Sequence, residues 1–353
     1  MNNVDTQYQA LLEDILDNGV IKSDRTGTGT ISVFGRQFRH NMREGFPLLT
    51  TKKMAIKTMM TELKWFLKGD TNIKYLVDNG CNIWNGDAYK QYATYALGLE
   101  EPDYSVHVDD PVQNKVRILT QAEFVRRIKR DDAFAMQWGE LGPIYGQQWR
   151  HWLIKDDIDN SGEYIWADQI AYLIEQLKTN PDSRRLMVNA WNVGSIPEMA
   201  LPPCHYGFQV YTRVLRQNER WTWYQKKTGN TMHHDHIEQE MDQEGVPTRA
   251  ISLAWNQRSV DTFLGLPFNI ASYATLLELL AHDTNMVADE LVGNLGDTHL
   301  YLNHIDAVHT QLENEPHPLP RIELSNVSLL DGEFDYEIID YVSAGRIKAP
   351  LSN

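Results

Sequence analysis

Residues 250–282 have the sequence AISLAWNQRSVDTFLGLPFNIASYATLLELLAH, which predicts a strand that leads into a long apolar helix. The strand begins at Ala250 and runs into the polar segment 257–261. Pro267 suits the first turn of the helix, which continues to about His282. In the whole chain, strands dominate the middle of the sequence and long helices surround them. This arrangement predicts the α+β class.

Segments that precede this stretch follow the same two patterns. Strands are predicted at residues 46–53, 186–191 and 207–215, and a helix is predicted over residues 54–68. The sequence contains no internal repeat and no Gly/Ser-rich linker. We therefore expect a single domain that spans residues 1–353.

Two stretches depart from these patterns, and we interpret them as insertions into the domain. They are residues 85–140, with an acidic tract and a helical run of mixed charge, and residues 217–248, a polar excursion. The second contains His233, His234 and His236. Imidazoles so close together could bind a transition metal, but neither helical spacing nor a pair of cysteines accompanies them. We expect a solvated loop here and no metal site.

The composition is that of a globular protein, with 42% hydrophobic and 23% charged residues. A formal net charge of -15 argues against broad affinity for nucleic acid or anionic membranes, which favour positive surfaces. The two cysteines, Cys81 and Cys204, do not make a disulfide framework. No signal peptide is apparent, and the longest uncharged run, residues 262–277, is too short and too polar to span a membrane. We expect a cytoplasmic protein.

The segment 201–205 (LPPCH) places a single cysteine after two prolines and before an imidazole. A thiolate becomes a nucleophile when nearby positive charge or hydrogen-bond donors stabilise it. Further along the chain, residues 257–261 (QRSVD) offer a guanidinium, a hydroxyl and a carboxylate. The pair predicts an enzyme in which Cys204 attacks an anionic substrate.

Two further positions have both a functional and a structural interpretation. Residues 24–30 (DRTGTGT) form a loop whose backbone N–H groups and Arg25 could bind a phosphate, or else a polar turn with a surface arginine. Glu62 lies inside a mostly apolar helix. It is either an acid on the helix surface or a buried carboxyl whose raised pKa suits proton transfer.

Nine motifs together resemble one family. They are DRTGTGT from Asp24, FPLLTTKK from Phe46, ELKWFLKGDTNI from Glu62, SRR from Ser183, AWN from Ala190, LPPCH from Leu201, QRSVD from Gln257, FLGLPFNIASY from Phe263 and GDTHLYLNH from Gly296. In this order they resemble the folate-dependent thymidylate synthase family over most of residues 5–85 and 141–351. The resemblance implies a large mixed β-sheet with flanking helices and a homodimer formed sheet to sheet.

The resemblance also implies a methyltransferase. It would convert dUMP to dTMP with 5,10-methylenetetrahydrofolate as cosubstrate, release dihydrofolate and need no metal. Cys204 would add to C6 of the pyrimidine and turn C5 into a nucleophile. Related deoxyuridylate hydroxymethylases let water capture the methylene intermediate instead of hydride, and this alternative stays open. A noncatalytic RNA-binding relative and a metal-dependent hydrolase built on the three histidines are two further alternatives.

The family pattern implies roles for individual residues of this sequence. The catalytic set would be Cys204, Glu62, Tyr145, Arg258, Asn269 and Asp261. The nucleotide would be held by Arg25, Arg184, Arg185, Gln257, Ser259, Asp261, Asn269, His299 and Tyr301, with Arg184 and Arg185 contributed by the partner subunit. The folate would contact Lys52, Ile83, Trp84, Asp261, Leu264, Gly265, Phe268 and Asn353.

Two positions bear on specificity and closure. Asn269 offers both a donor and an acceptor, which match O4 and N3–H of uracil, whereas relatives that act on deoxycytidylate carry Asp there. The C-terminal tail would close over the bound substrates and exclude water. Family members usually end in an apolar residue, but residues 350–353 here are PLSN, so closure could differ.

Overall fold

The structure is a computed structural model that describes residues 2–24, 26–98, 118–155, 165–232 and 236–351. A six-stranded sheet with the strand order β1-β2-β8-β7-β6-β5 forms its centre. β7 and β8 pair in parallel, and the other neighbours are antiparallel, so the prediction of a large mixed sheet is confirmed. The strands are β1 Val20–Lys22, β2 Thr30–Asn41, β5 Met187–Asn189, β6 His205–Val214, β7 Arg249–Asp261 and β8 Val287–Tyr301.

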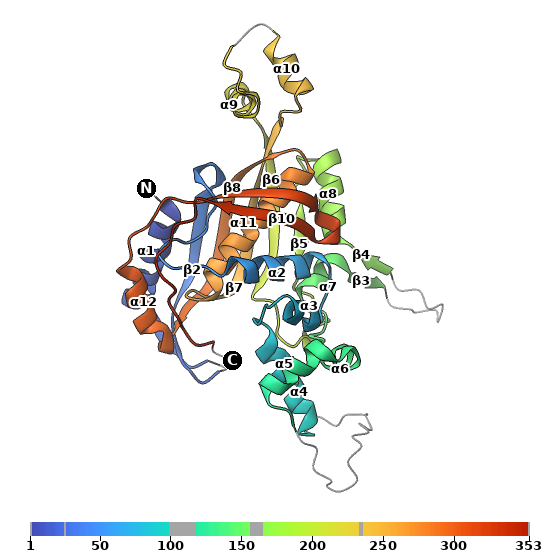
Figure 1. Ribbon diagram of the computed structural model, residues 1–353, viewed down its shortest axis with the longest axis vertical. Coiled ribbons are helices and arrows are strands. Elements are labelled where there is room, and N and C mark those ends of the chain that lie inside the picture. The colour runs from blue at the N-terminus through green and yellow to red at the C-terminus, as the bar shows by residue number, and fades with distance from the viewer. Residues whose placement is uncertain (1, 25, 99–117, 156–164, 233–235, 352–353) are drawn as a thin grey trace.

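Helices cover one face of this sheet (Figure 1). The long apolar helix is α11, Gly265–Asp283, and it packs against β7 and β8. The helix predicted over residues 54–68 is α2, Ile56–Leu67, which packs on α11. The other elements are α1 Asn3–Asn18, α3 Ile73–Asp78, α7 Tyr145–Arg150, α8 Gln169–Thr179, α12 Ile305–Leu312, and the strand pairs β3 Trp152–Lys155 with β4 Ile165–Ala167 and β9 Arg321–Ser328 with β10 Glu333–Ile339.

The alternation of side chains along β6 distinguishes the two faces of the sheet. Phe208, Val210 and Thr212 are buried, and the ring of Phe208 lies 5.9 Å from that of Tyr273 on α11. Side chains between them point to the opposite face, where Tyr211 is 67% exposed. The face away from α11 therefore presents a large aromatic side chain to solvent.

The strand prediction for residues 46–53 is wrong. These residues form no strand, because their polar groups bind partners outside the sheet. The backbone N–H groups of Thr50 and Thr51 both donate to the buried carboxylate of Asp5. The N–H of Lys53 donates to the carbonyl of Gly345 in the C-terminal tail. The segment is thus fixed by a side chain and by the tail, neither of which is adjacent in sequence.

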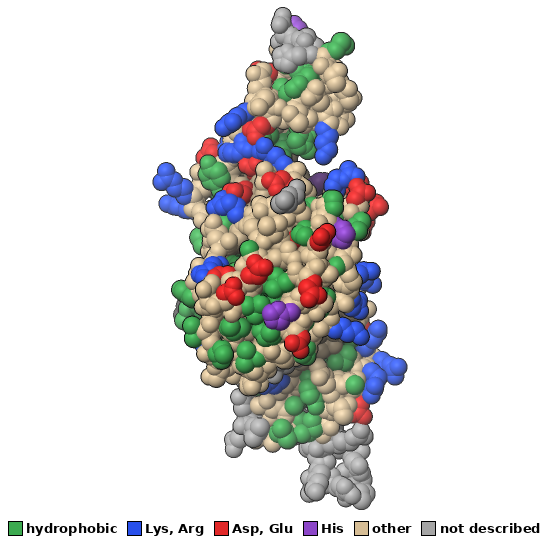
Figure 2. All heavy atoms as spheres, turned by 90° about the vertical axis from the view of Figure 1, so that its left-hand side faces the viewer, with side chains coloured by type: hydrophobic (Ala, Val, Ile, Leu, Met, Phe, Trp, Pro, Cys, Tyr) green, Lys and Arg blue, Asp and Glu red, His purple; other side chains and the backbone are tan. Residues whose placement is uncertain are grey.

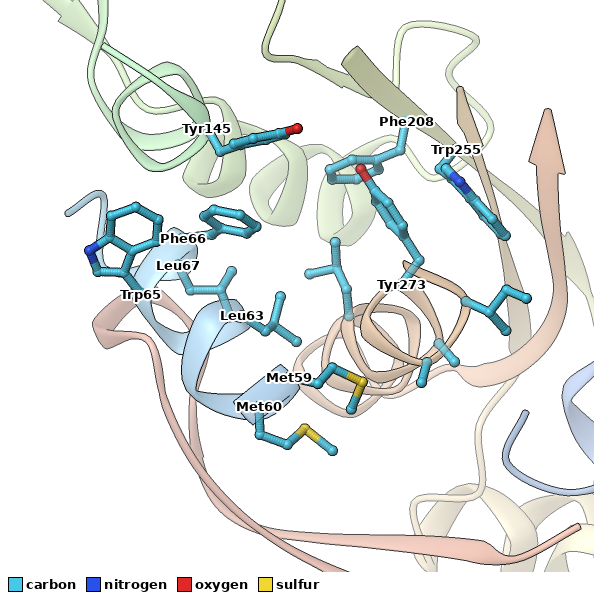
Figure 3. Close-up of a cluster of buried hydrophobic side chains, with 14 of the residues drawn as sticks. Met59, Met60, Leu63, Trp65, Phe66, Leu67, Tyr145, Phe208, Trp255 and Tyr273 are labelled. Carbon is cyan, nitrogen blue, oxygen red and sulfur yellow. The ribbon is translucent and has the colours of Figure 1, made fainter. Parts of the chain in front are cut away.

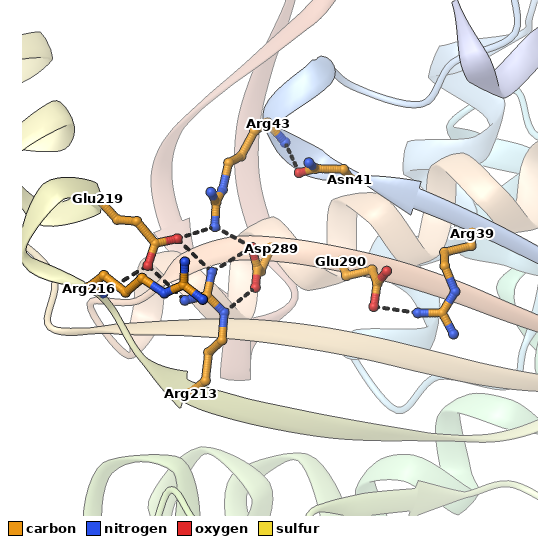
Figure 4. A network of polar contacts seen from close by, with 8 residues as sticks. All are labelled: Arg39, Asn41, Arg43, Arg213, Arg216, Glu219, Asp289 and Glu290. Atoms are coloured by element: carbon orange, nitrogen blue, oxygen red, sulfur yellow. Dashed lines mark hydrogen bonds and ion pairs between the residues drawn. The ribbon is translucent and has the colours of Figure 1, made fainter.

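The described part of the polar excursion, residues 217–232 and 236–248, contains two helices, while the solvated loop expected at residues 233–236 lies mostly outside the described residues. The helices are α9, Gln217–Thr228, and α10, Ile237–Gln243, which enclose a small apolar core of their own. Glu219 in the first turn of α9 forms an ion pair with Arg213 of β6. Arg213 also pairs with Asp289, and Arg43 pairs with both Glu219 and Asp289, so the two carboxylates and two guanidiniums form one network (Figure 4). The sequence analysis did not predict this core, because the segment is mostly polar and only a few apolar residues, such as Tyr224 and Met241, form the core.

Residues 85–140 contribute a second projecting lobe. Its described elements are α4 Asn85–Ala96, α5 Gln121–Arg130 and α6 Asp132–Trp138, packed around the aromatic rings of Tyr92, Phe124 and Phe134. The two lobes lie at opposite ends of the molecule (Figure 1), and Figure 2 shows acidic and basic side chains interspersed between them. Among the described residues, no helix is both long and apolar enough to cross a membrane.

Candidate functional site

Cys204 lies immediately before β6, and the pairing of β6 with β7 brings Arg258 beside it. His205 pairs with Gln257, and the N–H of Arg258 donates to the carbonyl of Cys204 at 2.8 Å. The Arg258 guanidinium binds the carbonyls of Pro202 at 3.0 Å and Pro203 at 2.9 Å. Two prolines therefore supply the acceptors that hold a positive charge next to the cysteine, a setting that favours the thiolate.

Tyr145 and His205 are buried beneath the segment that carries Cys204. The Tyr145 hydroxyl oxygen accepts a hydrogen bond from the Cys204 N–H at 2.7 Å, and its ring lies 4.4 Å from that of His205. His205 Nδ1 and the Tyr273 hydroxyl are 2.8 Å apart. Burial lowers the pKa of His205 to about 3, so this imidazole is neutral and contributes no positive charge to Cys204.

The aromatic cluster beneath these groups comes from five elements of the chain: α2, α7, β6, β7 and α11. Phe66 of α2 faces Tyr145 with ring centroids 4.7 Å apart (Figure 3). Tyr273 of α11 lies between Phe208 and Trp255, at 5.9 and 5.4 Å (Figure 3). Rigid packing of this kind fixes Tyr145, and therefore the backbone of Cys204, in one position.

Glu62 projects from α2 and accepts a hydrogen bond from the indole nitrogen of Trp84 at 2.8 Å. Burial raises the pKa of Glu62 to about 7, and the bond from Trp84 partly opposes this shift. A carboxyl with this pKa exchanges its proton near neutral pH, as a general acid or base requires. The interpretation of Glu62 as a merely exposed helix residue does not fit these contacts.

Gln257 is buried and orients Asn269. Its Nε2 donates to Asn269 Oδ1 at 3.1 Å and to the carbonyl of Ser259 at 3.1 Å, while its Oε1 accepts from Trp255 Nε1 at 3.2 Å. These bonds fix which end of the Asn269 amide faces Gln257. The amide nitrogen of Asn269 is left to donate on the other side.

The ends of β7 and β8 bring three more predicted residues together. Asp261 and His299 pair across the two parallel strands, and the ring of His299 lies 5.4 Å from that of Tyr301. Asp261 Oδ1 accepts from the N–H groups of Phe263 and Leu264, each at 3.1 Å, and so shapes the turn into α11. An ideal Cβ on Gly265 would lie 3.4 Å from Asp261, so the backbone approaches closely here.

Lys52 lies behind this turn and is buried. Its ammonium donates to the carbonyl of Phe263 and sits 3.8 Å from the centroid of the Phe263 ring. Burial lowers the pKa of Lys52 to about 7, while Asp261 and Asp5 favour its charged form. In this arrangement Lys52 supports the turn that carries Asp261. The apolar residues predicted for the folate wall, Ile83, Leu264 and Phe268, are partly buried against the core.

Arg184 and Arg185 do not meet Cys204 within one chain. Both are exposed and precede β5, and Leu186 binds Val210 of β6 through a backbone hydrogen bond. Val210 is six residues from Cys204, which corresponds to roughly 20 Å along a strand. β5 covers Met187–Asn189, within the strand predicted at residues 186–191, and both arginines precede it.

Some predicted site residues lie outside the described residues: Arg25, Asn353, His233 and His234. In the part of the chain that the structure describes, no three His, Cys, Asp or Glu side chains come together in a metal-binding group. Sequence reasoning missed the supporting roles of Phe66 and Tyr273, and the bond from Trp84 to Glu62. Their spacing along two helices gives no sign of a shared site, because α2 and α11 meet only in the tertiary structure.

Comparisons with known proteins point to one family. A family model described as thymidylate synthase matches residues 6–353. A protein of Listeria innocua named thymidylate synthase is 42% identical over 354 residues, which cover 98% of this chain and 99% of the relative. A protein of Mycoplasma mobile with the same name is 42% identical over 349 residues, with the same coverage.

Proposed function

The chain belongs to the thymidylate synthase family, and on that premise we propose how its residues methylate dUMP. The reaction is a reductive methylation that yields dTMP. 5,10-Methylenetetrahydrofolate is the cosubstrate, supplies the one-carbon unit and the hydride, and leaves as dihydrofolate. The observation that best supports the residue assignments is the convergence of Cys204 and Arg258 where β6 begins and β7 ends.

Cys204 is the nucleophile that adds to C6 of the uracil ring. Arg258 favours its thiolate form and, with Ser259, binds the 5′-phosphate. Asn269 donates from its amide nitrogen to O4 of uracil and accepts from N3–H with Oδ1, an orientation supported by the bond from Gln257. Addition at C6 moves electron density onto O4 and C5, and the Asn269 contact stabilises that charge.

Glu62 and Tyr145 move protons in the same site. Glu62, with a pKa of about 7, gives a proton to O4 through water and helps remove the proton from C5 after the one-carbon unit is attached. His299 and Tyr301 hold the ribose 3′-hydroxyl. Asp261 binds the pterin, while Ile83, Trp84, Leu264 and Phe268 form an apolar wall that excludes water. Release of Cys204 from C6 completes the cycle.

A homodimer completes the phosphate site in this proposal. The face of the sheet away from α11 is supported as the contact surface by a shallow hollow of about 510 Å³ bordered by residues of β6, β7 and β8, including Tyr211, Ala254 and Val292. Arg184 and Arg185 lie beside the middle of β6, about 20 Å from Cys204, so a two-fold partner that reverses the strand direction would bring them to the opposite site. We place the enzyme in the cytoplasm, with residues 1–353 forming one domain.

The product of the reaction tests the function directly. After incubation with dUMP and 5,10-methylenetetrahydrofolate, we expect a product with the mass of dTMP, together with dihydrofolate. A hydroxymethyl product with tetrahydrofolate would instead identify a hydroxymethylase, which the names of the relatives do not favour. Cys204→Ser should abolish turnover and leave dUMP binding largely intact, and a fully active variant would contradict the mechanism.

A further inference from the structure

The C-terminal tail is tied to the body of the protein at two places. The N–H of Ala344 donates to the carbonyl of Thr50 at 2.8 Å, close to the bond between Lys53 and Gly345. Farther along, Nε2 of His304 lies 2.7 Å from the carbonyl oxygen of Pro350. A carbonyl only accepts, so Nε2 must carry the proton and donate it. This contact is one residue before Leu351, where the described tail ends.

His304 lies between the two halves of the proposed active site. Its ring is 5.5 Å from that of Tyr301, which we assign to the ribose, and Tyr301 in turn lies 5.4 Å from His299. The same imidazole is 5.5 Å from the ring of Phe263, which follows the turn formed by Asp261. A shift of the tail at Pro350 would therefore move His304 and, through its ring contacts, disturb the residues proposed to bind the nucleotide and the pterin.

The polarity of His304 is not explained by packing. The residue is fully buried, and its Nδ1 makes no hydrogen bond with any described residue. Leaving a buried polar atom unpaired is costly, and an apolar ring would fill the same space without that cost. The hydrogen bond from Nε2 to Pro350 is the interaction that an imidazole provides here and a phenyl ring does not.

We propose that His304 is a positioning residue that fixes the C-terminal tail through Pro350 and aligns it with the residues that bind the ribose and the pterin. This inference rests on the proposed function for its kinetic consequence. The contact itself does not depend on that function. His304 acts on the reaction through the backbone of the tail and needs no contact with either substrate.

The kinetic test compares two substitutions at His304. His304→Phe keeps a ring but loses the donor, and we expect about a tenfold fall in kcat/KM for 5,10-methylenetetrahydrofolate, the size of one hydrogen bond. The Kd for dUMP alone should change by less than about twofold, because the tail closes after the nucleotide binds. His304→Gln restores an N–H donor and should recover much of the loss. His309→Phe, on the exposed side of α12, is the matched control and should behave as wild type.

A second arm tests the contact without turnover. Digestion of the unliganded tail by a carboxypeptidase should be severalfold faster in His304→Phe than in wild type or His309→Phe. In a chain that ends at Ala349, which lacks the acceptor, His304→Phe should cause no further loss of kcat/KM. A further loss there, or unchanged kinetics and digestion in a folded His304→Phe protein, would overturn the proposal. If His304→Phe does not fold, His304→Leu, which also lacks the donor, takes its place in both arms. The two proposals can fail separately. If the wild type makes no dTMP but digestion is still faster in His304→Phe, the proposed function is contradicted and the contact between His304 and Pro350 is supported.

Discussion

The indole Nε1 of Trp84 donates a hydrogen bond to Oε1 of Glu62 over 2.8 Å. Two residues from separate helical segments, one assigned to the folate wall and one to proton transfer, are thus joined by a single contact. Burial raises the pKa of Glu62 to about 7, and the indole lowers it because the bond favours the charged carboxylate. On the proposed assignments, a residue of the folate wall therefore also lowers the proton affinity of the carboxyl that transfers protons.

Replacing Trp84 should move the ionisation of Glu62. Trp84→Phe removes the donor, so the pKa of Glu62 should rise, and the limb of the kcat–pH profile that belongs to Glu62 should move upward by about one unit. The profile is measured at saturating folate, since the substitution also alters the apolar wall. Trp84→His, which retains an N–H donor, should move the limb less. A profile that is unchanged in Trp84→Phe would show that the bond has no influence on catalysis.

Glu62 should reduce the stability of the protein at alkaline pH. Its pKa is about 7 in the folded state and 4.5 when exposed, so the folded protein binds this proton more tightly. The contribution of Glu62 therefore becomes unfavourable as the pH rises from about 4.5 to about 7 and stays constant above that range. Glu62→Gln keeps an acceptor for Trp84 and should be more stable than wild type by roughly 2 kcal/mol at pH 8, with a much smaller difference at pH 5. Urea unfolding at the two pH values measures this, and an equal difference at both would contradict the buried ionisation.

Gln257 should control the choice of base through Asn269. In Gln257→Glu the donor to Asn269 Oδ1 becomes an acceptor, which favours rotation of the Asn269 amide so that its oxygen replaces its nitrogen opposite O4 of uracil. Binding of dUMP should weaken by about tenfold or more, because a buried donor and acceptor are then mismatched. Relative affinity for dCMP should increase. Calorimetric titration with both nucleotides measures the change, and Asn269→Asp provides the comparison. Equal preference in all three proteins would show that the base is recognised elsewhere.

Mixed dimers should separate the contributions of the two subunits. Cys204→Ser lacks the proposed nucleophile, and a variant with Arg184→Glu and Arg185→Glu lacks the guanidiniums proposed to reach the site of the partner subunit. Each homodimer should have little activity. Mixing them under conditions that exchange subunits should restore activity, because one of the two sites then has a wild-type cysteine and wild-type arginines from its partner. Sedimentation analysis verifies the exchange. No recovery after verified exchange would mean that the arginines serve the site of their own chain.

Local sequence patterns anticipated much of the fold. Residues 250–282 contain the predicted strand and helix as β7 and α11, although β7 extends through Asp261. The periodicity of residues 54–68 located α2. Local patterns were less reliable where polar residues are abundant, because the small core around Tyr224 and Met241 depends on a contact between two separate helices. The strand prediction for residues 46–53 failed because it also depended on a distant partner. The backbone N–H groups of Thr50 and Thr51 donate to the Asp5 carboxylate and not to a neighbouring strand.

The sequence by itself determined the chemical inventory: one cysteine beside prolines, the guanidinium of Arg258, the amide of Asn269 and an acid within an apolar helix. These are properties of residue type and short spacing, which a chain displays before it folds. The tertiary structure decided what surrounds each group. It buried Glu62 beside Trp84, kept His205 neutral, turned Asn269 toward Gln257 and separated Arg184 from Cys204 along β6. Proton affinity and orientation depend on burial and on partners distant in sequence, and only folding brings those together.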